Sequence, residues 1–141
     1  MAATPDSPLA STLSFRAAVC LVVAGMTWGL IMAASGNHET MPAHAHLNLL
    51  GWVCLFLFGI FYHLHPAIDR GRLARLQVGV WIAAVIVMSI GVGLVHSGHA
   101  IGDPIAALSS IVVLADMLLF GYLVFRKDSV AYASRAPLPA E

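Results

Sequence analysis

Four long apolar runs constrain the fold of this chain more than any other feature. They cover residues 14–34, 43–64, 73–95 and 104–125. Each is close to the ~20 residues that a helix needs to cross the hydrocarbon core of a bilayer. Because a backbone in lipid must satisfy its own hydrogen bonds, each run is expected to be an α-helix. The sequence therefore predicts an all-α integral membrane protein, built as a bundle of four transmembrane helices.

The composition supports a lipid environment. Of 141 residues, 60% are hydrophobic and only 10% are charged. A soluble domain of this length buries too small a fraction of its chain to hide so much apolar surface, so we expect the lipid bilayer to cover the rest. The formal net charge is zero. Nucleic acid is therefore not an expected partner, since it would require a basic patch.

The basic residues indicate how the helices are oriented. All seven lie at the beginning of the first run, in or beside the second connection or after the fourth run: Arg16, Arg70, Arg72, Arg75, Arg126, Lys127 and Arg135. The first and third connections contain no Lys or Arg. By the positive-inside rule, both termini should be cytoplasmic. We therefore expect a cytoplasmic segment over residues 1–13, a membrane domain over 14–125 and a cytoplasmic tail over 126–141, in the inner (cytoplasmic) membrane of a bacterium.

Seven histidines are unusual in such an apolar chain. Histidine is costly in a bilayer unless it faces the protein interior, a cavity or a ligand. In the predicted topology five lie at or near the outer face and two close the second helix at the cytoplasmic face: His38, His44, His46, His96 and His99, then His63 and His65. At ~1.5 Å of rise per residue, His46 and His63 are separated by about 25 Å, so they cannot serve one metal atom within one chain.

Five of these histidines also have ordinary explanations. His38 suits a solvated loop, and His63 and His65 lie where side chains reach the headgroup layer. His96 and His99 flank a Ser-Gly pair, where imidazoles can hydrogen-bond the end of a helix. We therefore look for a ligand-binding role first in the remaining pair.

His44 and His46 enter the second helix, where Asn48 is the next polar residue. Residues two apart on a helix are ~200° apart around its axis, so the two imidazoles should point to nearly opposite sides. They are poorly placed to chelate one ion together. The spacing favours one helix that serves two separate centres, or two neighbouring subunits.

The start of this helix resembles a known family. His46-Leu47-Asn48-Leu49-Leu50, followed by Trp52, Phe58-Gly59 and Phe61-Tyr62, is similar to the second transmembrane helix of the nitric oxide reductase large subunit, a member of the haem-copper oxidase superfamily. The resemblance implies that His46 is an axial ligand of a low-spin haem b on the outer side. Asn48 and Trp52 belong to the same motif, and Asn48 would either orient a ligand imidazole or bond a backbone carbonyl.

The resemblance covers essentially one helix of a subunit that has many more than four. The paired histidines of the copper or non-haem iron site are not evident in this chain. We therefore expect a haem-binding electron-transfer protein rather than a complete oxidase or reductase, because bis-His ligation leaves no open position on the iron. A five-coordinate haem would instead imply a gas sensor or a small reductase.

Two arrangements of the axial ligands follow from the resemblance. Subunit I of the superfamily consists of three four-helix arcs around a pseudo-threefold axis, so a free four-helix unit could assemble as a homotrimer. Haem would then lie between His46 of one chain and His44 of the next. Alternatively, His46 and either His96 or His99 would hold the haem within one chain. A quinol or a cytochrome is the expected redox partner.

Two other functions compete with haem binding. Imidazole and thioether ligands suit copper, so the outer residues could form a copper or zinc handling site: Met32, His38, Met41, His44, His46, His96 and His99. The third hypothesis is a structural membrane module whose histidines line a polar interface.

Asp116 lies about midway along the fourth run. A carboxylate at that depth is by default a functional residue, and it could relay protons or balance a cationic centre. The ordinary explanation is a protonated acid that is hydrogen-bonded to a neighbouring helix.

Overall fold

The computed structural model of the protein describes residues 9–133, with side chains described as far as residue 126. The described part is helical and contains no strand. Its elements are α1 (Ala10–Ser35), α2 (Met41–Asn48), the π-helix η1 (Leu49–Cys54), α3 (Leu55–His63), α4 (Pro66–Asp69), α5 (Arg72–His96) and α6 (Gly102–Ala133). The predicted all-α fold is confirmed.

Four helical segments are long and apolar enough to cross a membrane: Ala10–Ser35, Met41–His63, Arg72–His96 and Gly102–Arg126. The second consists of α2, η1 and α3 in succession. Each predicted run lies within or almost within one of these segments. The chain is therefore a multi-pass membrane protein with a four-helix bundle.

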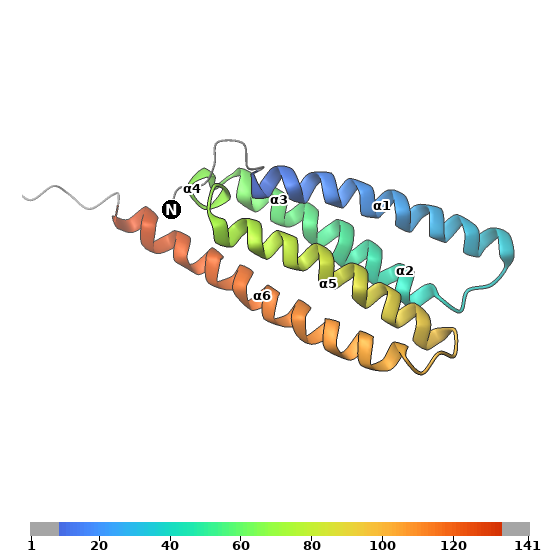
Figure 1. Cartoon of the computed structure of the whole chain (residues 1–141). Coiled ribbons are helices and arrows are strands. Elements are labelled where there is room, and N and C mark those ends of the chain that lie inside the picture. Colours follow the sequence, from blue (N-terminus) through green and yellow to red (C-terminus); the bar gives the residue numbers. More distant parts are fainter. Residues whose placement is uncertain (1–8, 134–141) are drawn as a thin grey trace, which may run out of the picture.

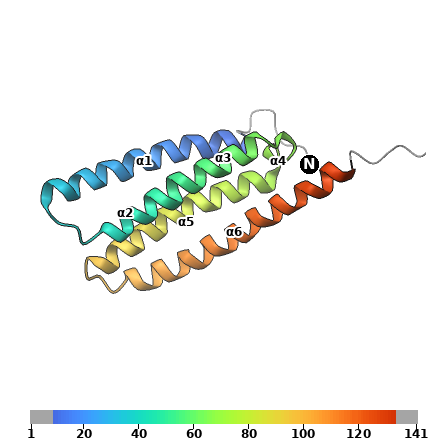
Figure 2. The ribbon, with the colours of Figure 1, turned by 180° about the vertical axis from the view of Figure 1, so that it is seen from behind.

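The spanning helices follow one another in a curved row, in the order of the sequence (Figure 1). The α2–η1–α3 segment packs between α1 and α5, and α6 packs along α5. The same order is visible from behind, with α1 and α6 at the two edges of the row (Figure 2). The inner helices are the better covered: 44% of the α5 span is buried, against 17% of each edge span.

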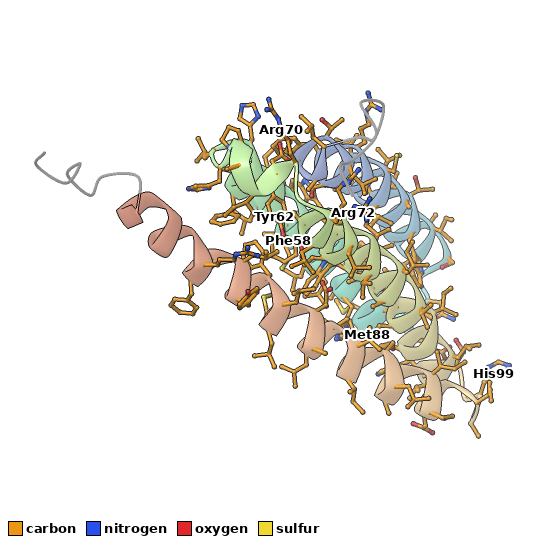
Figure 3. All side chains as sticks on the ribbon, turned by 60° about the vertical axis from the view of Figure 1, so that its left-hand side comes forward. Phe58, Tyr62, Arg70, Arg72, Met88 and His99 are labelled. Atoms are coloured by element: carbon orange, nitrogen blue, oxygen red, sulfur yellow. The ribbon has the colours of Figure 1, made fainter. Side chains whose placement is uncertain are left out.

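We name the two ends of the row by one residue each. The His44 end carries the turns 36–40 and 97–101, and the Arg72 end carries α4 and the beginning of α1 (Figure 1). Arg70 and Arg72 lie at the opposite end from His99 (Figure 3). The described basic residues therefore gather at one end, as the sequence predicts, and the cytoplasmic orientation of that end stays a prediction. Arg135 lies outside the described residues.

The core is largest toward the Arg72 end, where aromatic rings from three helices meet. Phe58 contacts Trp81 edge-on at 4.9 Å between ring centroids and Phe120 at 4.3 Å. Close packing also depends on small residues, because a Cβ on Gly59 would lie 2.7 Å from the ring of Phe15. Glycine, which has no side chain, thus allows helices to approach closely, as is common in membrane bundles.

The helix boundaries differ from the predicted ones at both chain ends. α1 begins at Ala10, inside the predicted segment 1–13, because its first turn is capped by a distant acid. The backbone N–H and the hydroxyl of Ser11 donate to the Asp69 carboxylate at 2.8 and 2.7 Å. α6 continues to Ala133, so the predicted tail 126–141 is helical in its first part. Residues 134–141 of that tail lie outside the described residues.

Candidate functional site

The helix that carries His44 and His46 is not a uniform α-helix. Immediately after Asn48, the six residues of η1 form a π-helix. Such segments are rare, and they occur frequently at functional sites. The indole N–H of Trp81 donates to the carbonyl oxygen of Leu50 in η1 at 2.9 Å. Trp52, which belongs to the motif of the sequence resemblance, lies in η1 with 41% of its surface exposed.

His46 is half-buried and has a defined orientation. Its Nδ1 lies 2.7 Å from the carbonyl oxygen of Pro42, one turn earlier in the same helix. A carbonyl oxygen only accepts hydrogen bonds, so Nδ1 must carry the proton. In the neutral imidazole the lone pair is then on Nε2. Metal-binding histidines in proteins typically have this arrangement, in which the second ring nitrogen donates to a backbone carbonyl or a carboxylate.

His96 repeats the arrangement at the end of α5. Its Nδ1 lies 2.9 Å from the carbonyl oxygen of Val92, four residues earlier, and its side chain is exposed. By the same argument, Nδ1 donates and Nε2 has the lone pair. His46 and His96 therefore both present an unprotonated Nε2 from the His44 end.

The packing of α2 on α5 aligns these two rings. A Cβ on Gly93 would lie 3.6 Å from the Cβ of Ala43, so these two residues face each other across the antiparallel pair. His46 follows Ala43 by three residues, and His96 follows Gly93 by three residues. Each ring folds back by one turn along its own helix, which brings both to the level of the Ala43–Gly93 contact.

The same offsets fix the side on which the rings lie. Two packed antiparallel helices are related by a local twofold axis. Two residues that follow the contacting residues by the same number of positions, one on each helix, therefore lie on the same face of the two helices. From this symmetry we infer that His46 and His96 lie on one face of the α2–α5 pair, near the level of the Ala43–Gly93 contact.

His44 faces a different helix. A Cβ on Gly29 of α1 would lie 3.0 Å from Cε1 of His44, so this ring packs on α1 of its own chain. The Asn48 amide lies 3.3 Å from Nδ1 of His44 and donates to the His44 carbonyl oxygen at 2.8 Å. The two imidazoles of the H-x-H pair diverge around the helix, as the spacing predicts, and Asn48 is bonded to His44 rather than to His46.

The remaining predicted histidines lie apart from this pair. His99 is exposed in the turn before α6 and projects from the end of the molecule (Figure 3). His38 is also exposed, with Nδ1 3.1 Å from the Gly36 carbonyl oxygen. His63 and His65 lie at the Arg72 end. Nowhere in the described part of the chain do three or more His, Cys, Asp or Glu residues gather as a group that could hold a metal ion.

Sequence reasoning missed a buried polar chain in the core. The Tyr62 hydroxyl donates to Oε1 of Gln77 at 2.7 Å, and Nε2 of Gln77 donates to Oδ2 of Asp116 at 2.7 Å. Asp116 thus accepts a hydrogen bond from the neighbouring helix α5, in agreement with a hydrogen-bonded acid in the ordinary explanation. Gln77 could have been found as a polar residue inside an apolar run, because such residues seldom face lipid.

Comparison of the chain with protein-family models, with curated proteins and with solved structures finds no match. Its function is therefore inferred from the chemistry of its own residues.

Proposed function

We propose that this protein binds haem b in the membrane and transfers electrons, with His46 and His96 as the axial ligands. The observation that carries the proposal is the position of His46 and His96 at one end of the packed α2–α5 pair, each with an Nδ1–H hydrogen bond to a backbone carbonyl oxygen, of Pro42 and of Val92. His65 makes the same kind of bond but lies at the Arg72 end. The bonds of His46 and His96 each hold an imidazole in the tautomer that can ligate through Nε2. Their equal offsets from the Ala43–Gly93 contact support a position of both rings on one face of the α2–α5 pair, which suits a pair of axial ligands.

The surroundings of the pair fit an apolar macrocycle. Many exposed side chains of the spanning helices are hydrophobic, including Leu49, which is one turn after His46. Burial and axial ligation set the potential of a haem, and a bis-imidazole haem iron supplies reversible one-electron transfer. The likeness of His46-Leu47-Asn48-Leu49-Leu50 to the haem-bearing helix of haem-copper oxidase subunit I agrees with His46 as the first ligand.

A saturated iron has no free position for a substrate, so we propose an electron carrier that exchanges electrons with a quinol or a cytochrome. We further propose a homo-oligomer, in which copies cover the edge helices α1 and α6. These are the least buried spans of the chain. We also propose a bacterial inner membrane as the location, with the His44 end outside, which is the orientation that the distribution of basic residues favours.

An absorption spectrum of the purified protein tests the proposal. The full chain, purified in detergent without added metal, should show a Soret band and sharp α and β bands after dithionite reduction. The pyridine haemochrome should identify haem b, and elemental analysis should find iron. A colourless protein with stoichiometric copper would contradict the proposal and would favour the copper-handling hypothesis.

A further inference from the structure

The polar chain of Tyr62, Gln77 and Asp116 has no part in the proposed haem site. It joins α3, α5 and α6 inside the core, and Tyr62 follows Phe58 by four residues, near the end of α3 (Figure 3). Tyr62 and Gln77 are completely buried, and Asp116 is 4% exposed. Along α5, Gln77 is sixteen residues from Gly93, about 24 Å at the helical rise. The acid is therefore remote from His46 and His96.

No cation compensates Asp116 within the described structure. Among the residues whose side chains are described, no Lys, Arg or His forms an ion pair with it, and its polar partner on α5 is the neutral Gln77. Arg75 precedes Gln77 by two residues and so points about 200° away around α5. The other titratable groups nearby are Tyr62 on α3 and Asp69 on α4, neither of which is a cation. An ionised Asp116 would be an uncompensated charge in an apolar core, which strongly favours the neutral acid.

The hydrogen bonds nevertheless support the ionised form as well. Both hydrogen bonds of this polar chain run toward Asp116. The Tyr62 hydroxyl donates to the Gln77 side-chain amide, which in turn donates to Oδ2 of Asp116. Consecutive bonds of this kind polarise each other and strengthen the last one. Oδ1 accepts no hydrogen bond from any described residue, so a proton can be added there without disturbing the chain. The same hydrogen bonds thus accommodate both protonation states.

We propose that Asp116 is a reversible proton-binding site of the membrane domain, with Gln77 and Tyr62 as its positioning residues. The site is independent of the proposed haem. Asp116 differs from a buried acid that is permanently neutral, because the Gln77 amide is already placed to donate a hydrogen bond to its anion. It also differs from a structural ion pair, because its charge appears and disappears with the proton.

The apolar reagent dicyclohexylcarbodiimide tests this proposal on the full chain in detergent. The proton of a neutral carboxylic acid passes to a carbodiimide nitrogen while the carboxyl oxygen bonds to the central carbon, and rearrangement gives a stable acylurea with no leaving group. Mass spectrometry should find one such adduct on the peptide that contains Asp116. Infrared spectra should show a protonated carboxyl stretch that declines as the pH is raised.

Variants locate the site. Asp116→Asn should lose both signals, whereas Asp69→Asn should keep them. Gln77→Leu should increase the labelled fraction at a given pH, because the anion loses its hydrogen-bond donor. The pH-dependent carboxyl band in the wild-type protein establishes reversible protonation, and the adduct assigns it to Asp116, even if a variant does not fold. An adduct together with a carboxyl band that does not change with pH would show a permanently neutral acid and would overturn the proposal. Absence of both would overturn the proposal.

Discussion

Trp81 donates its indole N–H to the carbonyl oxygen of Leu50, at 2.9 Å, from the buried side of α5 into the π-helix that follows His44 and His46. A π-helix leaves the regular i to i−4 ladder, so some of its backbone groups need other partners. Trp81 is completely buried and supplies one of them. The orientation of the histidine-bearing α2 relative to α3 therefore depends on a side chain of another helix.

Trp81→Phe should destabilise the protein by about 1–3 kcal/mol, because the buried carbonyl of Leu50 loses its donor. The matched control is Trp28→Phe, which removes a 3.0 Å hydrogen bond to the Thr40 hydroxyl near the solvent-exposed turn. Denaturant titration in detergent measures both. An effect of Trp81→Phe no larger than that of the control would show that the indole does not hold the π-helix.

Gly25→Ala should disturb the contact between α1 and α2. The new Cβ would lie 2.6 Å from the amide atoms of Asn48, so either that side chain or the helix must move. We expect a loss of about 1–3 kcal/mol in the free energy of unfolding, as for other overpacked sites. Gly79→Ala is the control, because nothing lies within 4 Å of its Cβ position. Equal stability of the two variants would contradict the described packing.

Asp69→Asn should weaken the attachment of α4 to the beginning of α1. The carboxylate accepts two hydrogen bonds from Ser11 and lies at a helix N-terminus, where a negative charge is favourable. An amide retains one acceptor and loses the charge, so we expect about 1–2 kcal/mol of destabilisation. Asp103→Asn, in the exposed first turn of α6, removes a comparable charge without a buried partner. Thermal unfolding of the two variants should differ, and identical midpoints would refute the role of Asp69.

The four spans could be predicted from the sequence because hydrophobic length alone determines them. The divergence of His44 and His46 was also predictable, since it follows from helical periodicity. The π-helix was not, because residues 49–54 are ordinary apolar residues and the irregularity depends on Trp81, more than 25 positions later in the chain. Local sequence contains no signal for a hydrogen bond made by another helix.

The candidate site was predicted only in part. The sequence gives His46 and His96 as candidates, but their common level and face depend on the contact between Ala43 and Gly93. Pairings between helices are set by tertiary packing, so the sequence left the second ligand open between His44 of a neighbouring copy and His96 or His99 of the same chain. The partnership of Gln77 with Asp116 was hidden for the same reason.

His96→Ala tests the second ligand. We expect the variant to keep a part of its haem in a five-coordinate, high-spin form, which electron paramagnetic resonance of the oxidised protein detects. Added imidazole should restore the low-spin signal, because it occupies the vacated position. His99→Ala is the control and should stay low-spin. A low-spin His96→Ala variant together with a high-spin His44→Ala variant would instead assign the ligand to His44, in line with a haem shared between copies.

The most direct test of the proposed function is the haem-to-protein ratio of His46→Ala, measured by pyridine haemochrome on the purified protein beside the wild type and His63→Ala. Imidazole ligation through Nε2 of His46 predicts that His46→Ala loses its haem, whereas His63→Ala, at the opposite end of the same spanning segment, retains the wild-type ratio. A His46→Ala protein with a full complement of haem and an unchanged spectrum would contradict the proposal.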